Sequence, residues 1–362
     1  LMRDVQRHMP NDSDLTPFRD AGIAGMNFNF TGRYPSYHSA FDVPGRLSVD
    51  TLQHLGEYAL PLTRHFGQLD LGRVDAPDHV YFDVAGLWFV HYPASWAPYL
   101  TAGLVFAYLL ALYFAVRTGQ ARIRGAIVAF FAWLALCVFV CAAGYVIIRA
   151  LEFGTDRITS ARIPRTFNQH PIHWAADFYL AAFVLAALAA TFAALHYYRR
   201  WMTAYEIILA GLLLSVALAV GSTVYIRGGS GLFTWPPSFV TLSVLPMCGK
   251  KHEGRISRIQ TVALLAGALP CTVLLSPGIQ LFNEAMTIGL VYVTLGFVML
   301  LCTLLLPVLL LIGERRGRSP ALKTLLLAIL IGVLGTIAIP VRSGQARNLA
   351  QAIRAGDIDR SE

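Results

Sequence analysis

The sequence predicts a mainly α-helical membrane protein, in which a transmembrane bundle of about eight helices follows a short soluble α/β segment. Three observations support this fold class. The chain of 362 residues is 56% apolar and only 14% charged, whereas about a quarter of the residues in a soluble domain are charged. From Trp96 onward the apolar residues form blocks of about 20 residues, which is the length that crosses a bilayer. Residues 1–95 instead mix charges, Pro, Gly and alternating patterns.

Composition divides the chain into four parts. We expect a soluble α/β segment over residues 1–72 and a joining segment over 73–95. The membrane domain follows over 96–340, and a polar tail over 341–362. The joining segment is rich in Tyr, Phe and Trp, which suits either a membrane interface or a strand packed on the soluble segment. The sequence begins at Leu1 without a signal peptide, so we expect that an upstream part precedes it or that the first span directs insertion.

Three elements are expected in the soluble segment. A short helix begins near Asp14, with Ser13 or Asp14 as its cap. A strand is expected over residues 22–30, where apolar residues alternate with asparagine. A loop over 31–44 precedes a helix capped by Ser48 or Asp50. Apolar residues recur at every third or fourth position of that helix and form one face, which consists of Leu52, Leu55, Ala59, Leu62 and Phe66. This order suits the last layer of an α/β domain, and so small a piece buries only a marginal core by itself.

Eight spans are predicted from the apolar blocks. They lie near 96–116, 125–148, 175–198, 204–226, 231–248, 259–277, 286–312 and 322–340. The fifth is the weakest, because it is short and contains Trp235-Pro236-Pro237. Prolines are tolerated in a span where neighbouring helices satisfy the freed backbone groups. In the third span Ala182, Ala186, Ala190 and Ala194 recur at every fourth position and predict a face for close helix packing.

Basic residues predict the orientation of the bundle. Lys and Arg concentrate in the first, third, fifth and seventh connections, whereas the fourth holds only Arg227 and the sixth holds none. The second connection also holds four arginines, diluted over a longer loop: Arg149, Arg157, Arg162 and Arg165. Cytoplasmic loops carry such an excess, so residues 1–95 and both termini are expected on the non-cytoplasmic side, in a periplasm or an organelle lumen. These basic connections account for the net charge of +8. No nucleic-acid partner is expected, because the soluble segment lacks a basic face with interleaved aromatics.

The loop around His38 is the strongest candidate for chemistry. His38 lies in the polar loop that directly follows the predicted strand, where a rigid backbone can present an imidazole to a metal ion. Asp42 could hold that imidazole by a hydrogen bond, and the Tyr37 phenol could donate to a developing oxyanion. A lone histidine in a loop is usually an ordinary loop residue, so the residues alone favour that interpretation over a metal ligand.

The order of short motifs around His38 resembles the closing segment of the zinc aminopeptidase family that includes glutamate carboxypeptidase and the transferrin-receptor ectodomain. The resemblance covers residues 10–70 and rests on Ser13-Asp14, Pro17-Phe18, Gly22-Ile23-Ala24-Gly25, Tyr37-His38-Ser39 and Asp42. Ala24 stands where the family commonly has Pro. With the spans that follow, the architecture is similar to the membrane-embedded branch of vacuolar membrane proteases and endoplasmic-reticulum metallopeptidases. The soluble segment would then be the C-terminal remnant of an α/β di-zinc peptidase domain.

This resemblance implies roles for four residues. His38 matches the final zinc ligand and Tyr37 the group that stabilises the tetrahedral intermediate, while Asp14 and Asp42 match supporting acidic positions. The family holds two zinc ions and hydrolyses peptides, often as an aminopeptidase. Its other ligands and its Glu base would lie before Leu1, so this chain alone is expected to be inactive. The expected partners are membrane lipids and a peptide substrate.

Two alternatives stay open at this level. One is a transporter- or receptor-like membrane protein with a degenerate, non-catalytic ectodomain, and the other is a purely structural anchor. An upstream His-x-Asp and Glu-Glu pair would favour the enzyme.

The remaining candidates for a site are weak. His252-Glu253 lacks the second His of a zincin helix, and His170 and His173 flank Pro171 in a loop. Three carboxylates lie at span ends, where they can reach water at little cost: Asp177, Glu206 and Glu284. Of these, Glu284 hints at a polar re-entrant turn. The five cysteines lie in or beside apolar blocks and indicate no disulfide framework.

Overall fold

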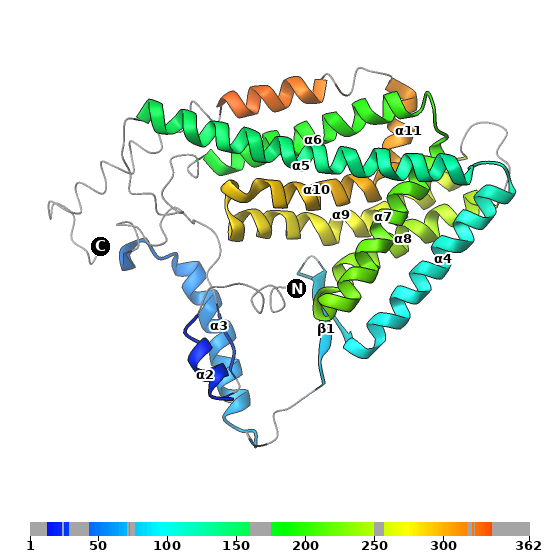
Figure 1. Cartoon of the computed structure of the whole chain (residues 1–362). Coiled ribbons are helices and arrows are strands. Elements are labelled where there is room, and N and C mark those ends of the chain that lie inside the picture. The colour runs from blue at the N-terminus through cyan, green and yellow to red at the C-terminus, as the bar shows by residue number, and fades with distance from the viewer. Residues whose placement is uncertain are drawn as a thin grey trace.

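The computed structural model describes residues 13–23, 25–28, 43–70, 72, 77–84, 86–159, 175–249, 257–316, 321 and 323–334. Helices account for most of these residues, and a large bundle follows the N-terminal elements (Figure 1). Several helices of the bundle are long and apolar enough to cross a membrane. The predicted fold class, mainly helical with multiple spans after a short N-terminal segment, is therefore confirmed.

Two helices represent the N-terminal segment, α2 (Thr16–Asp20) and α3 (Val49–Phe66). The α3 helix begins where the sequence predicts, because the Ser48 hydroxyl accepts a hydrogen bond from the Thr51 backbone N–H at 3.3 Å. The predicted capping of α2 by Ser13 or Asp14 is wrong. Leu15 occupies the cap position without a side-chain bond, and the Thr16 N–H donates to the Ser13 backbone carbonyl at 2.8 Å.

The strand predicted over residues 22–30 is also wrong where that range is described. Residues 23 and 25–28 form no strand, because a strand needs a neighbour to pair with. Among the described residues the neighbours are absent, and Met26 and Phe28 remain 50% and 43% exposed. Gly25 instead lies against α2, where a Cβ atom would come within 2.5 Å of Leu15 Cδ1. The absence of a side chain at Gly25 therefore lets the chain return close to α2.

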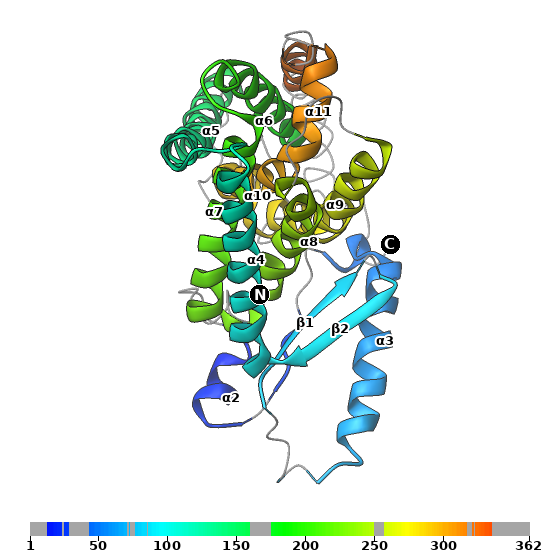
Figure 2. The same ribbon diagram turned by 90° about the vertical axis from the view of Figure 1, so that its right-hand side faces the viewer.

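The joining segment folds into an antiparallel hairpin of β1 (His79–Val84) and β2 (Trp88–Pro93). Its turn uses Gly86 at a φ of 71°, and the Gly86 N–H donates to Asp83 Oδ1 at 2.6 Å. One face of the hairpin packs against the bundle through Val80 and Tyr92, which are buried. Burial raises the pKa of the Tyr92 phenol. Figure 2 shows the two strands beneath the bundle, beside the first membrane helix.

Five helices are long and apolar enough to span a membrane. They are α4 (Ala97–Arg117), α5 (Ile123–Thr159), α6 (Ala176–Tyr198), α7 (Ala204–Tyr225) and α9 (Arg258–Met286). A sixth span arises if α10 (Val291–Leu304) and α11 (Leu306–Arg316), which are bent by 68°, are counted together. The described residues thus support five or six spans rather than the predicted eight.

The two remaining predicted spans coincide with shorter helices. The α8 helix (Gly231–Cys248) has the predicted bounds but carries Pro236, Pro237 and Pro246. An apolar helix over Lys323–Leu334 covers part of the predicted eighth span, whose last residues lie outside the described ranges. The predicted seventh span is broken just before Pro307, since a proline has no N–H to continue the helix and disfavours helical geometry at the residue before it.

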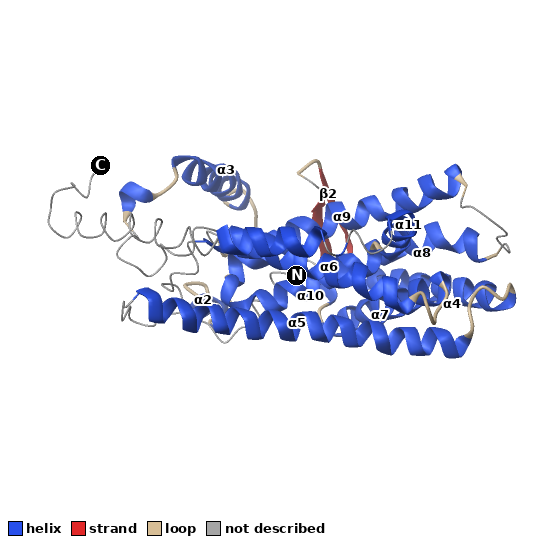
Figure 3. Ribbon diagram, turned by 90° about the horizontal axis from the view of Figure 1, so that it is seen from above, coloured by secondary structure: helices blue, strands red, loops and turns tan. Residues whose placement is uncertain are grey.

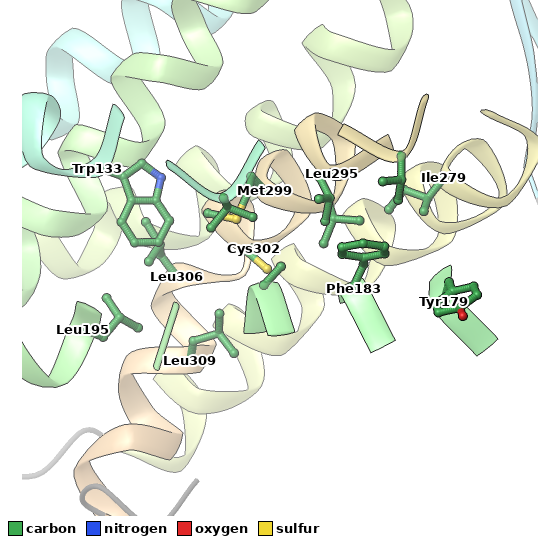
Figure 4. Close-up of a cluster of buried hydrophobic side chains, with 14 of the residues drawn as sticks. Trp133, Tyr179, Phe183, Leu195, Ile279, Leu295, Met299, Cys302, Leu306 and Leu309 are labelled. Carbon is green, nitrogen blue, oxygen red and sulfur yellow. The ribbon is translucent and has the colours of Figure 1, made fainter. Parts of the chain in front are cut away.

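The bundle contains two large apolar clusters. One joins α5, α6 and α10 around Trp133, Leu295 and Met299 (Figure 4), and the Trp133 indole N–H donates to Thr303 Oγ1 at 2.8 Å. The other joins α4, α7, α8 and α9 around residues such as Leu209 and Leu275. Figure 3 shows α5 running along the length of the bundle. The packed core of this protein therefore lies between its membrane helices.

Hydrogen bonds gather three chain segments at one end of the bundle. Thr118 Oγ1 donates to the Cys248 carbonyl at 3.0 Å, and Gln120 Nε2 donates to the Met247 carbonyl at 3.3 Å. Thr203 Oγ1 donates to the Gln120 carbonyl at 2.9 Å. The α4–α5 turn, the α6–α7 turn and the end of α8 therefore meet. The start of α8 lies at the hairpin, so α8 runs from one end of the bundle to the other.

Candidate functional site

The predicted active-site residues fall mostly outside the described part of the chain. Tyr37, His38 and Asp42 lie in the range 29–42, which the structure does not describe. Asp14 is described and lies exposed in the turn that precedes α2. The proposed roles of these four residues therefore stay predictions.

The elements that flank this range are described. On its N-terminal side, Leu15 of the turn before α2 lies against Gly25. On its C-terminal side, a single 3-10 turn over Pro44–Arg46 leads into α3. The range that carries His38 thus lies in sequence between these two described parts of the chain.

The described residues do not by themselves provide a zinc site. They contain no group of three His, Cys, Asp or Glu side chains that could hold a metal ion. The two histidines of α3 contact aromatic rings instead, His54 with Tyr58 at 4.6 Å between ring centroids and His65 with Phe66 at 5.2 Å. His170, His173 and His252, the other histidines considered for metals, lie outside the described ranges.

A buried carboxylate occupies the end of the bundle where the turns meet. Glu206 is 0% exposed and accepts hydrogen bonds from the backbone N–H groups of Arg122 at 3.0 Å and Thr203 at 2.9 Å. Arg122 Nε also donates to it at 3.2 Å, and Gly125 leaves room for the carboxylate. The expectation that Glu206 reaches water at a span end is wrong. The residue closes a capping box on α7 and binds the preceding turns together.

A second polar group lies where α9 passes into α10. Arg149 pairs with Glu152 at 2.6 Å, and Arg149 Nη2 lies 3.5 Å from the Gly289 carbonyl. Thr287, between the two helices, has a φ of 63°, a conformation that costs a non-glycine residue energy. Glu284 is half-buried and accepts a bond from Gln280 Nε2 at 3.0 Å. A tight polar turn joins α9 and α10, and the sequence had indicated it only through Glu284.

A comparison with family models decides the nature of the N-terminal segment. The model of peptidase family M28 matches residues 3–63. Residues 3–63 belong to peptidase family M28. This M28 segment includes Asp14, Tyr37, His38 and Asp42, so the resemblance inferred from the motifs is confirmed at the level of the family.

Curated relatives extend the match only over a short stretch. The human protein "Endoplasmic reticulum metallopeptidase 1" is 30% identical over 91 residues, which are 24% of this chain and 10% of that protein. Its mouse counterpart is 30% identical over 109 residues, which are 29% of this chain and 12% of that protein. The matched part of the chain thus spans about a tenth of the length of these relatives. No solved structure matches the chain.

Proposed function

We propose that this chain belongs to a membrane-anchored, zinc-dependent peptidase of aminopeptidase type, with the M28 segment at its active site and the helical bundle as its anchor. One observation carries the proposal. A segment of peptidase family M28 is followed in the same chain by at least five helices that could cross a membrane. The similarity to proteins named as metallopeptidases of the endoplasmic reticulum supports the same combination.

Within this proposal four residues of the M28 segment have roles. His38 binds one of two zinc ions through a ring nitrogen, and Asp42 orients the imidazole. The Tyr37 hydroxyl donates a hydrogen bond to the oxyanion of the tetrahedral intermediate, and Asp14 supports the loop. The zinc pair, when bound, would activate the attacking water.

We also propose that the M28 segment lies on the non-cytoplasmic side. The end of the bundle where the α4–α5 and α6–α7 turns meet the end of α8 carries Arg117, Arg122, Arg199 and Arg200. Cytoplasmic loops are enriched in such residues, and the hairpin that follows the M28 segment lies at the other end of α8. A reporter that is active only in the cytoplasm should be active when fused after Arg258 and silent when fused after Glu362. The reverse pattern would overturn the orientation.

The zinc site is tested with His38→Ala in the protein expressed with its complete coding sequence. We expect loss of bound zinc and of nearly all peptide hydrolysis, because a catalytic zinc ion needs three protein ligands. His54→Ala is the matched control, since His54 lies on the exposed surface of α3 in the same M28 segment. Full zinc content and activity in His38→Ala would contradict the assignment. An unsubstituted protein without zinc or hydrolysis would favour the alternative, a receptor- or transporter-like protein with a degenerate ectodomain.

The role of Tyr37 is tested with Tyr37→Phe in the same protein. This change removes only the hydroxyl, so zinc content and KM should stay unchanged. The kcat should fall by roughly 10²–10³-fold, as when one oxyanion donor is removed from other hydrolases. A change in KM alone would show that Tyr37 contacts the substrate without stabilising the intermediate.

A further inference from the structure

The hairpin that joins the M28 segment to the bundle is held rigidly by one of its two faces. Val80 is 1% exposed and Tyr92, its partner across the strands, is 7% exposed. A Cβ atom at Gly231, the first residue of α8, would lie 3.1 Å from side-chain atoms of Val80 and Phe82. The Tyr92 ring meets the Trp235 ring of α8 edge-on at 6.4 Å. The position of the hairpin relative to the membrane helices is therefore fixed.

The other face and the tip of the hairpin expose large apolar side chains. Tyr81 and Phe89 lie on the outer face with their rings 5.9 Å apart and are 50% and 67% exposed. Leu87 and Trp88 at the tip are 74% and 70% exposed. The exposure continues through Trp96, which directly precedes α4 and is 57% exposed, to Tyr99 in the first turn of α4, which is 78% exposed. We call Tyr81, Leu87, Trp88, Phe89, Trp96 and Tyr99 the aromatic surface.

We propose that this aromatic surface lies in the interfacial layer of the bilayer, in the leaflet at the end of the bundle opposite the arginine-rich turns. It follows that the hairpin is a second membrane anchor beside the spans. Contiguous exposed apolar groups of this kind are unfavourable in water and mark a contact surface. Trp and Tyr concentrate at membrane–water interfaces, where their rings contact hydrocarbon and their polar atoms remain hydrated.

Two observations favour lipid over a soluble protein partner. The aromatic surface is continuous with a helix that spans the membrane, since Trp96 and Tyr99 belong to the candidate span Ala94–Arg117. In addition, residues 74–116 contain no Lys or Arg, whereas arginine is enriched at protein–protein interfaces together with aromatic residues. The one carboxylate near the tip, Asp83, is exposed and already accepts the Gly86 N–H, which suits the hydrated layer of the headgroups.

The position of the hairpin sets a limit on the position of the M28 segment. Only a short stretch separates Asp70, beyond the end of α3, from Pro77, before β1. A fully extended chain spans at most about 3.5 Å per residue, so this stretch reaches about 25 Å. Asp70 must therefore remain within about that distance of Pro77, and a membrane-anchored hairpin would hold the end of the M28 segment near the bilayer.

The test measures the depth of nitroxide labels in phosphatidylcholine nanodiscs. Leu87→Cys and Phe89→Cys are labelled in the full chain, and the accessibility of each label to oxygen and to a water-soluble nickel complex is compared. Phe106→Cys, in the middle of α4 and 64% exposed, is the membrane control. Tyr58→Cys, on α3 and 51% exposed, is the aqueous control. The unsubstituted protein gives the background from the five free cysteines, which are buried or half-buried in the described helices.

We expect the ratio of oxygen to nickel accessibility at positions 87 and 89 to be several-fold higher than at position 58 and lower than at position 106. A ratio equal to that at position 58 would place the hairpin in water and overturn the proposal. Protection from both reagents would also overturn it, since a protein surface would then cover the hairpin.

A second variant separates folding of the hairpin from membrane contact. Leu87→Asp combined with Phe89→Asp changes only side chains that point away from α8, so the contacts of Val80 and Tyr92 with the bundle should persist. A label at Tyr81→Cys should then move toward the aqueous value. No change in this label would show that the aromatic surface does not depend on lipid contact.

Discussion

The helices α3 and α7 show how differently the two regions of this chain are stabilised. They have 18 and 22 residues, and both begin with a side-chain cap, at Ser48 and at Thr203. Yet α3 buries none of its residues, whereas α7 buries eleven, including the carboxylate of Glu206. Helix formation is therefore a local property here, and burial depends on the neighbours that the rest of the chain supplies.

The neighbours explain the difference. The α7 helix lies among α4, α5, α8 and α10, which cover it on several sides. The apolar face predicted for α3 exists in sequence, but Leu52 on that face is 51% exposed. In an α/β domain such a helix packs against a sheet, and the described residues of the M28 segment contain no strand. Substitutions in the two regions should consequently have very different effects on stability.

The largest expected difference is between Leu209→Ala in α7 and Leu52→Ala in α3. Leu209 is 0% exposed, so truncation leaves a cavity and should lower the free energy of unfolding by about 3 kcal/mol. Leu52→Ala should change it by less than about 0.5 kcal/mol. Thermal unfolding of the chain in detergent micelles measures both. Equal effects would mean that α3 has a packed neighbour in solution. The same Leu52 substitution in a protein with a whole peptidase domain should be more costly, which would identify a sheet of that domain as the neighbour.

A similar contrast is expected between two glutamates. The Glu206 carboxylate accepts hydrogen bonds from the N–H groups of Arg122 and Thr203. In Glu206→Gln one carboxylate oxygen becomes an NH₂ group, which must then face one of these donors. Leaving one buried donor unsatisfied should lower stability by about 2 kcal/mol. Glu57 of α3 is exposed and accepts a hydrogen bond from Gln53 at 3.2 Å, so Glu57→Gln should be close to neutral. Denaturation by increasing SDS would measure the difference. An unchanged Glu206→Gln protein would show that the carboxylate does not hold the turns together.

The smallest expected effect concerns two glycines within the bundle itself. A Cβ atom at Gly211 of α7 would lie 2.5 Å from Leu306 Cδ1 and 3.0 Å from Thr303 Cγ2, while nothing lies within 4 Å of such an atom at Gly103 of α4. Gly211→Leu should therefore lower stability by about 1–2 kcal/mol through overpacking. Gly103→Leu should be neutral or slightly stabilising, because leucine favours a helix more than glycine does. Comparable thermal midpoints for the two variants would contradict the packing of α7 against the α10–α11 bend.

Local pattern determined much of this protein. The helix over α3 with its Ser48 cap, the bounds of α8 and the spans α4, α6 and α7 are close to those predicted. Hydrogen bonds within a helix join residues that are near in sequence, and the thickness of the bilayer sets the length of apolar sequence that a span needs. The motif order around His38 was sufficient to identify the M28 family. The roles of Tyr37, His38, Asp42 and Asp14 depend on ligands from elsewhere in space, so they stay predictions.

The tertiary structure decided the features that require a distant neighbour. The predicted strand did not form in its described part, because no second strand pairs with it. The bend before Pro307 turned one predicted span into two helices, and Glu206 became buried because Arg122 and Thr203 donate to it from two different turns. The alanines of α6 predicted its packing face, yet the fully buried row is one position further, at Phe183, Ala187, Thr191 and Leu195. A one-residue shift rotates a helix face by about 100°, and only the helices on either side determine which face is buried.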